Sequence, residues 1–339
     1  MRKFLWLAAA ALLIPPHARA APPPPAPKTR SAAQIIKDAP DSDWVTIAPD
    51  DLLVMTLAPD AAGQPRRVVI QLLPAPFSQG WIGNIRRLAT AHWWDNTAVY
   101  RVQDNFVAQF GDPDEDTPHA KPLPPGLAVM PESAYAARLP ITTLSALTTR
   151  RITTETFDTT ALFLNGWPMA TARDIRENFI VDARTGKPLP PSTHQNVWPT
   201  HCYGTIGVGR NNSPDTGTGA ELYAVIGTPP RQLDRNIAVV GRVIAGIEHL
   251  SSLPRGPAPM GMYGDKAKNT PILSIRLASA LPPAQQPRLQ SLSTTSDSFR
   301  DYVSARIHRR DSFYILSPGS ADICNIPVPI RPAPDLSTP

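Results

Sequence analysis

Short runs of apolar residues recur along the chain and are bounded by turn-forming residues. Runs of this length and composition are typical of β-strands. The clearest pair is 52–57 and 68–73, which a turn through Pro59, Asp60 and Gly63 joins into a predicted hairpin. Further strands are predicted at 44–47, 100–110, 205–208, 222–226 and 238–243.

Helical spacing of apolar residues occurs in few places. Between Trp81 and Ala89 the apolar residues lie on one face of a helix, and Ser78 is a suitable N-cap for it. The same spacing over 247–253 predicts a second short helix, which Pro254 ends.

Many short strands with two short helices far apart in sequence favour a mainly β protein. We expect a closed antiparallel β-barrel that the two helices plug. The chain has 41 Pro among 339 residues, well above the usual ~5%, and this disfavours long helices. Hydrophobic residues make up 42% and charged residues 18%, which is enough apolar material for a folded core.

The N-terminus has the three parts of a secretory signal peptide. Arg2 and Lys3 precede an apolar run over 4–14, and an Ala-x-Ala site ends at Ala20. The apolar run is too short to span a bilayer, so we expect cleavage after Ala20 and no stable membrane insertion afterwards. The protein is then periplasmic or secreted.

Composition divides the rest of the chain. We expect a Pro-rich linker at 21–40 and a barrel at 41–255 that carries an insertion at 113–199. The insertion is rich in proline and is predicted to be an elaborated loop with one short helix near 132–139. Residues 256–339 are predicted to form a C-terminal extension packed on the barrel.

An amphipathic pattern over 299–307 predicts a helix in this extension. Its polar face carries four arginines, namely Arg300, Arg306, Arg309 and Arg310. This pattern fits a docked helix with a solvated basic face, or a surface for a membrane or an acidic partner.

Two cysteines, Cys202 and Cys324, stand 122 residues apart in sequence. In an oxidising compartment they are candidates for one structural disulfide; the alternative is two buried thiols. They have no Cys-x-x-Cys spacing, and the histidines show no metal-ligand spacing. We therefore expect no metal.

Charge and motifs exclude several functions. Removal of residues 1–20 lowers Lys+Arg from 33 to 30 against 28 acidic residues, and no basic stripe with interleaved aromatics indicates nucleic-acid binding. The chain lacks a Gly-x-Ser-x-Gly elbow, a His-Glu-x-x-His motif and a Walker loop. The glycines at 204–209 lack the order of a dinucleotide site, so tight turns are expected there.

The most informative segment runs from Val99 to Pro113. In a strand-turn-strand arrangement Arg101, Phe106 and Gln109 converge on one concave surface, which combines a fixed cation, an apolar wall and an amide. The segment resembles the cyclophilin family of peptidyl-prolyl cis-trans isomerases, which has an arginine, a phenylalanine and a glutamine at the same spacing.

The resemblance extends over about 50–112 and 200–255. It includes, in order, the strand at 68–72, Ala75-Pro76, Asn84, Trp94-Asp95, the glycine-initiated strand at 204–209, the element 218–223, Leu233-Asp234 and the pattern 240–243. It implies the barrel fold, action on proline-containing polypeptides and no cofactor. The oligomeric state and the natural client stay open.

The resemblance also implies the chemistry. Rotation about an X-Pro bond is slow because it breaks amide resonance, with a barrier of ~18–20 kcal/mol. A permanently charged guanidinium can stabilise the lone pair that the twisted imide nitrogen gains. We expect this role for Arg101, while Phe106 holds the proline ring and Gln109 binds the peptide backbone. Tyr223, Leu233 and Gly209 are expected to complete the substrate site.

Four positions depart from the family pattern. Gln232 stands at the usual pocket tryptophan, Ile237 at the pocket histidine, Glu221 at a glutamine and Gly209 at an alanine. We count Gln232 and Glu221 among the substrate-binding candidates and expect reduced isomerase activity on exported proteins. The alternative is a catalytically weak or inactive module that binds proline-containing peptides or a partner protein.

Overall fold

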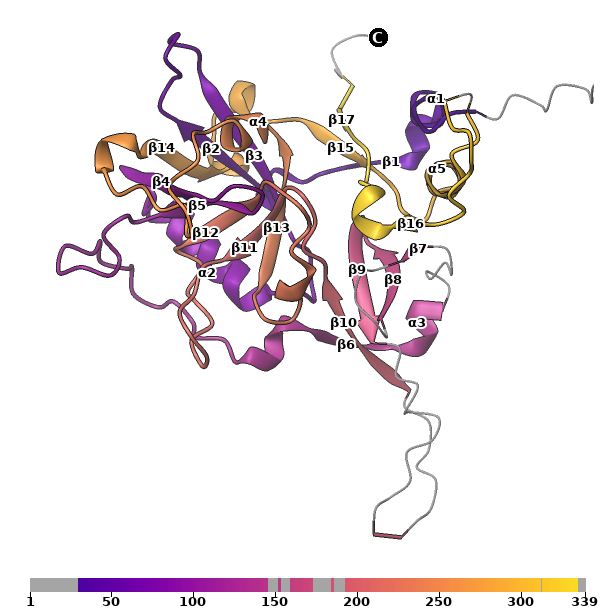
Figure 1. The fold of residues 1–339 in the computed structure, drawn as a ribbon, viewed down its shortest axis with the longest axis horizontal. Coiled ribbons are helices and arrows are strands. Elements are labelled where there is room, and N and C mark those ends of the chain that lie inside the picture. Colours follow the sequence, from indigo (N-terminus) through magenta and orange to yellow (C-terminus); the bar gives the residue numbers. More distant parts are fainter. Residues whose placement is uncertain are drawn as a thin grey trace, which may run out of the picture.

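The computed structural model describes residues 30–145, 152–153, 159–172, 184–185, 193–311 and 313–334. The predicted signal peptide and the proline run of the predicted linker lie outside the described residues. The described chain forms a β-barrel and a second lobe of helices and small sheets beside it (Figure 1).

The barrel is closed and every strand pair in it is antiparallel. The predicted mainly β fold class is confirmed. In order around the barrel, the strands are β11 (Thr205–Val208), β12 (Leu222–Val225), β5 (Val107–Gly111), β4 (Thr97–Val102), β14 (Thr270–Leu277), β2 (Leu52–Leu57), β3 (Arg66–Leu72) and β13 (Val239–Ala245).

Two helices lie at opposite ends of the barrel (Figure 1). Helix α2 (Gln79–Thr90) inserts Trp81, Ile85 and Leu88 into the barrel core, and α4 (Glu248–Ser251) adds Leu250. Both helices occupy the predicted places. Ser78 precedes α2 as expected, but it has a left-handed backbone and its side chain makes no capping hydrogen bond.

The barrel boundaries differ from the prediction at both ends. Strand β14 closes the gap between β4 and β2, whereas the sequence predicts that residues after 255 form an extension. Strand β1 (Trp44–Thr46) pairs with β15 (Leu289–Leu292) outside the barrel. The alternating apolar residues of 270–277 did not indicate a strand because this segment lies among prolines.

The insertion forms a sheet rather than a long loop. After a 3-10 turn at Glu132–Tyr135, a four-stranded sheet forms in the order β6 (Ala137–Pro140), β10 (His194–Pro199), β9 (Trp167–Ala172) and β8 (Thr159–Leu164), and α3 (Ile141–Ser145) follows β6. Leu162 of β8 packs on the barrel core, while Ala161 and Phe163 pack on a second core. Successive side chains of a strand point to opposite faces, so β8 contributes to both cores and joins the two lobes.

Both chain ends build the second core. Helix α1 (Ala32–Asp38) lies in the region predicted as linker; Ser31 accepts a hydrogen bond from the Gln34 backbone, and Ile35 is buried. It packs beside α5 (Asp297–His308), and β1, β15 and β17 (Ile330–Pro332) form a small sheet. A short parallel pair joins β16 (Ala321–Asp322) to β7 (Ile152–Thr153).

Helix α5 is docked. Its apolar face, Phe299, Tyr302, Val303 and Ile307, is buried. This agrees with the first of the two interpretations of its basic pattern. Among the described residues, no helix has the length and apolar character needed to cross a membrane.

A disulfide joins Cys202, just before β11, to Cys324 in the C-terminal segment. It ties the barrel to the second lobe across 122 residues of sequence. The thiol alternative is therefore wrong.

We expect replacement of both cysteines by serine to lower the free energy of unfolding by about 2–4 kcal/mol, because the crosslink restricts the unfolded chain. Urea titration of both proteins under oxidising conditions measures the change. With reductant, the two curves should converge. A difference that persists in reductant would contradict the explanation.

Candidate active site

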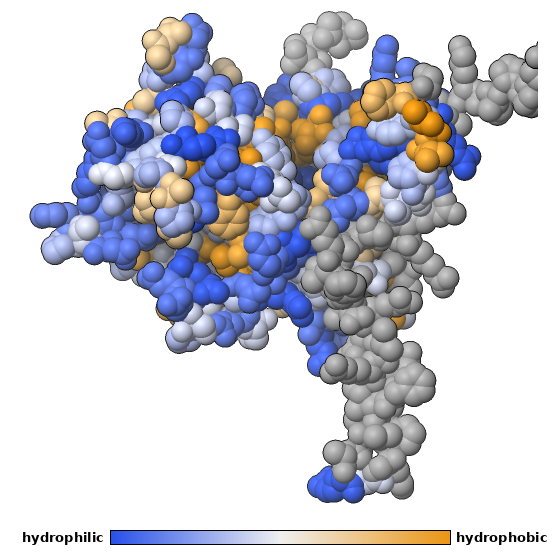
Figure 2. All heavy atoms as spheres, in the orientation of Figure 1, coloured by the Kyte–Doolittle hydropathy of each residue, from blue (hydrophilic) through white to orange (hydrophobic). Residues whose placement is uncertain are grey.

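All predicted site residues except Gln232 meet in a cavity of about 540 Å³ on the outside of the barrel. Arg101 comes from β4, Gln109 from β5 and Tyr223 from β12. Phe106 lies in the turn between β4 and β5, and Leu233 in the 3-10 turn η5 (Arg231–Leu233). On the face shown in Figure 2, hydrophobic residues gather in a patch over the barrel that hydrophilic residues surround.

Strand register places three of these residues in a row. Arg101 is paired with Gln109, and Gln109 is paired with Tyr223. Directly paired residues of antiparallel strands project from the same face. Their neighbours Val102, Ala108 and Ala224 belong to the barrel core, so the row itself faces outward.

A β-bulge in β4 brings one more side chain to this face. Val99 pairs with Phe110 and Arg101 with Gln109, so Tyr100 is an extra residue on β4. A bulge re-aims the side chains around it. As a result the consecutive residues Tyr100 and Arg101 both line the cavity.

The Arg101 guanidinium is half-buried and donates to three neutral oxygen acceptors. Nε donates to the Met260 carbonyl (2.7 Å), Nη1 to Gln109 Oε1 (2.9 Å) and Nη2 to Gln103 Oε1. Its Cζ lies 6.0 Å from the centre of the Phe106 ring. Burial lowers the pKa of Arg101. Within the described chain, no carboxylate forms an ion pair with it.

The segment before β14 holds Arg101 from the other side. Val102 N–H donates to the Gly261 carbonyl (2.8 Å), and Tyr263 N–H to that of Tyr100 (3.0 Å). Met260 and Met262 add half-exposed side chains to the cavity. Sequence reasoning missed this segment, because two methionines in a proline-rich stretch carry no recognisable signal.

Tyr223 and Phe106 form an apolar wall with Leu233 and Ile237. Gly207 leaves room for the tyrosine ring, since a Cβ there would lie 2.3 Å from Tyr223 Cζ.

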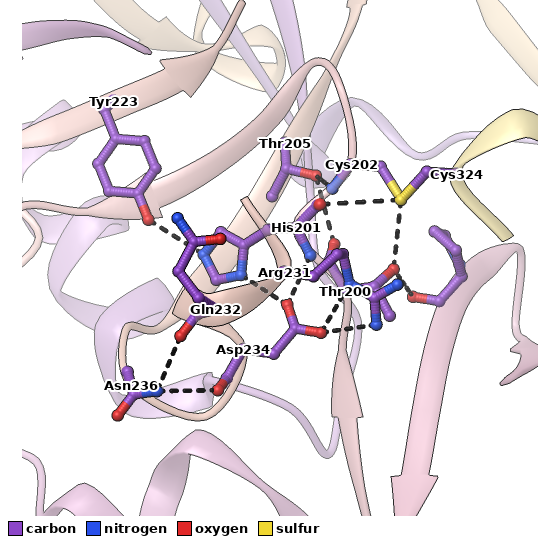
Figure 3. A network of polar contacts seen from close by, with 11 residues as sticks. Thr200, His201, Cys202, Thr205, Tyr223, Arg231, Gln232, Asp234, Asn236 and Cys324 are labelled. Carbon is purple, nitrogen blue, oxygen red and sulfur yellow. Dashed lines mark hydrogen bonds and ion pairs between the residues drawn. A yellow bond between two sulfur atoms is a disulfide. The ribbon is translucent and has the colours of Figure 1, made fainter. Parts of the chain in front are cut away.

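A buried polar network fixes Tyr223 from behind (Figure 3). Its hydroxyl lies 3.0 Å from His201 Nε2, and His201 Nδ1 lies 2.9 Å from Asp234 Oδ1. Arg231 Nε donates to Asp234 Oδ2 (2.8 Å).

The charges in this network balance. Burial opposes ionisation of Asp234, but the hydrogen bond from His201 and the charge of Arg231 outweigh it and lower the pKa of Asp234. The Asp234 carboxylate can only accept, so His201 Nδ1 donates to it, and His201 Nε2 lies against the Tyr223 hydroxyl. Burial raises the pKa of Tyr223, so its phenol stays protonated. The network positions the wall, and sequence reasoning did not detect it.

Glu221 lies behind Gln109 and is buried. Gln109 Nε2 donates to the Tyr100 hydroxyl (2.6 Å), which donates to Glu221 Oε2 (2.8 Å). The Asp112 backbone N–H donates to Glu221 Oε1 (2.7 Å). Burial, followed by the charge of Glu115, raises the pKa of Glu221 to about 8.

Glycines make room for this carboxyl group. A Cβ on Gly111 would lie 2.0 Å from Glu221 Oε2, and one on Gly209 would lie 2.9 Å from Glu221 Cβ. Gly209 lines the cavity as predicted, and its N–H donates to the Glu221 carbonyl (2.7 Å).

Gln232 does not join the site. Its side chain is exposed, and Gln232 is absent from the described lining of the cavity, whereas Leu233 beside it is part of the lining. The 3-10 turn directs consecutive side chains to different sides. Gln232 therefore occupies the sequence position of the family's pocket tryptophan, but its side chain does not reach the pocket.

The described lining of the cavity is charged as well as apolar. It contains no serine, cysteine or histidine, and beside the apolar wall it has three cations and five carboxyl groups, namely Arg101, Lys121, Arg210, Asp112, Glu115, Asp116, Asp215 and Glu221. Among the described residues, no group of three His, Cys, Asp or Glu side chains is placed to hold a metal ion.

Comparisons with known proteins identify the class. A sequence model of the family "Cyclophilin type peptidyl-prolyl cis-trans isomerase/CLD" matches residues 69–277. The fold resembles the crystal structure of cyclophilin AquaCyp293 from Hirschia baltica, with a TM-score of 0.61 and 21% identity over 89% of this chain and 98% of that one. No curated protein sequence matches significantly.

A second structure is the Cryptosporidium parvum cyclophilin type peptidyl-prolyl cis-trans isomerase in the presence of the dipeptide Ala-Pro. It matches with a TM-score of 0.34 and 10% identity, over 66% of this chain and 98% of that one.

The match to the family model defines the class as peptidyl-prolyl cis-trans isomerase. The chain belongs to the cyclophilin-type peptidyl-prolyl cis-trans isomerase family, because the family model covers more than half of it. The family resemblance drawn from short motifs is confirmed.

We expect Glu221→Gln to change the pH dependence of stability. The pKa of Glu221 is raised in the fold, so its favourable contribution is complete below about 4.5 and is lost as pH rises towards about 8. A glutamine does not ionise. The free energy of unfolding of the variant, relative to wild type, should therefore increase between pH 5 and 8, by ~1.4 kcal/mol for each unit of the pKa difference.

Urea titrations at several pH values test this expectation. Glu248→Gln, on the exposed surface of α4, is the matched control and should follow wild type. Parallel stability curves for Glu221→Gln and wild type would show that Glu221 has an ordinary pKa.

Proposed function

We propose that the protein catalyses rotation about X-Pro bonds of exported polypeptides and that Arg101 stabilises the twisted imide. The observation that carries this proposal is the row of Arg101, Gln109 and Tyr223 across three neighbouring strands, at the edge of an apolar wall.

Arg101 has donors to spare for a substrate. A guanidinium carries five N–H groups. In the described part of the chain, three of these groups donate to Met260, Gln109 and Gln103. The other two N–H groups are left for a ligand in the cavity. Because the three acceptors are neutral, the positive charge is not cancelled by a neighbouring carboxylate.

Twisting of the imide bond creates the group that Arg101 recognises. In the planar ground state the nitrogen lone pair is delocalised, and in the twisted state it is localised on nitrogen. A fixed N–H donor therefore interacts more strongly with the twisted state, which lowers the barrier. Orientation of the guanidinium by three acceptors before the substrate binds makes this stabilisation available without rearrangement.

The other residues hold the peptide. Phe106, Leu233, Ile237 and the Tyr223 ring offer an apolar surface for the proline ring. Gln109 Nε2 uses one hydrogen on Tyr100 and retains a second for a backbone carbonyl of the peptide. Since Gln232 lies outside the cavity and Ile237 cannot donate a hydrogen bond, we propose weaker substrate binding than a tryptophan and a histidine would give.

We expect Arg101→Ala to lower kcat/KM on a proline-containing peptide by at least tenfold, which is ~1.4 kcal/mol of barrier. Arg300→Ala, which removes an exposed arginine from α5, is the matched control and should retain wild-type activity. Equal low rates for wild type and Arg101→Ala would favour the alternative of a binding module without meaningful catalysis.

The proposal that the clients are exported proteins rests on the leader at 1–20. The disulfide supports it, because such crosslinks persist in oxidising compartments.

We expect the purified mature protein to begin at Ala21 and to appear in the periplasmic or secreted fraction, as N-terminal sequencing of fractionated cells will show. Ala20→Lys should block processing. A mature protein that begins at Met1 in the cytoplasm would contradict export.

A further inference from the structure

Four side chains form a continuous line of hydrogen bonds behind the cavity. Arg101 Nη1 donates to Gln109 Oε1 (2.9 Å), and Gln109 Nε2 donates to the Tyr100 hydroxyl (2.6 Å). Tyr100 donates to Glu221 Oε2 (2.8 Å). The line connects the cation at the cavity to a buried carboxyl group.

An ionised Glu221 gives every bond in the line the same direction. The carboxylate can only accept, so the single Tyr100 proton points to it. The Tyr100 oxygen is then free to accept from Gln109 Nε2. That contact turns Gln109 Oε1 towards Arg101, where it accepts from the guanidinium. The orientation of the amide is therefore determined from the carboxylate end.

A protonated Glu221 breaks this order. The Asp112 N–H donates to Oε1, so the carboxyl proton resides on Oε2, which faces Tyr100. The Tyr100 oxygen then receives that proton, and its own proton turns to Glu115 Oε1, which lies 3.2 Å away. Gln109 Nε2 must then share the Tyr100 oxygen with the Glu221 proton, so the Gln109 amide is held less firmly.

We propose that Tyr100 and Glu221 are positioning residues for Arg101, and that ionisation of Glu221 switches the site from a loosely held to a firmly held guanidinium. This inference rests on the proposed role of Arg101. It predicts an enzyme whose activity rises with pH, although its stability falls over the same range.

The groups around Glu221 determine the pH range in which it ionises. Tyr100 faces it from β4, and Asp112 and Glu115 face it from the segment after β5. Asp116, Asp215, Arg210 and Lys121 are further charged residues of the cavity lining. Burial and the charge of Glu115 raise the pKa of Glu221 to about 8. Burial likewise raises the pKa of Tyr100, so the phenol keeps its proton throughout.

The test is a pH profile of kcat/KM between pH 6 and 9.5. A blocked proline-containing peptide without ionisable groups is the substrate, and NMR exchange without a coupling protease is the assay. For wild type we expect a rise of about fivefold centred near pH 8, which is the effect of one well-placed hydrogen bond.

For Glu221→Gln, kcat/KM should not change with pH and should equal the value that wild type has at the acid end of the range. The Asp112 N–H selects the amide oxygen as its acceptor, so the amide NH2 faces Tyr100 and mimics the protonated acid. Tyr100→Phe should also be flat, because it interrupts the line. A merely structural role for either residue would lower activity equally at every pH and leave the rise in place.

Two controls sharpen the result. Glu115→Gln should keep the rise and move its midpoint to lower pH, since it removes a charge that raises the pKa of Glu221. Glu248→Gln, on α4 and outside the described lining of the cavity, should reproduce the wild-type profile.

The outcomes separate this inference from the proposed mechanism. A flat wild-type profile, or a rise that persists in Glu221→Gln, would overturn the switch even if Arg101→Ala abolishes activity. Full activity of Arg101→Ala would instead overturn the role of Arg101. A rise that only wild type, Glu115→Gln and Glu248→Gln show would support the switch.

Discussion

One extra residue in β4 determines which side chains of the barrel face the cavity. Without the bulge, strict alternation would turn either Tyr100 or Arg101 towards the barrel core. With it, both reach the cavity while Val99 and Val102 remain in the core. Arg101 thereby obtains Gln109 as its acceptor, and Gln109 obtains Tyr100 as its own. The wall, the amide and the buried carboxyl group are all arranged around this local change of register.

Much of the barrel could be predicted from sequence because its strands are short apolar runs with clear turns. The hairpin 52–73 and the two helices carry such patterns, and the family motifs lie on the same elements. Strand β14 and the insertion sheet could not be predicted in this way. Their strands contain prolines or mixed polar residues, and they are stabilised by partners distant in sequence, such as Leu53 opposite Leu277 and Val197 opposite Thr171.

The convergence of Arg101, Phe106 and Gln109 on one cavity could be predicted because it depends on spacing along one hairpin. The rest of the cavity could not be predicted because it depends on packing. Gln232 was misplaced because a 3-10 turn separates neighbours, and the network through His201, Asp234 and Arg231 was missed because its members become partners only after folding. Glu221 was recognised as unusual, but only the structure shows its connection to Tyr100.

The order of strands around the barrel also has a consequence for synthesis. Strand β14 sits between β4 and β2, so a chain that ends before residue 270 presents two open sheet edges in the middle of its barrel. The second core additionally needs α1 from one end and α5 from the other. The barrel therefore cannot close until β14 has left the ribosome, and the second core cannot form until α5 has followed it. A product truncated before β14 exposes adhesive strand edges instead of a smaller working enzyme.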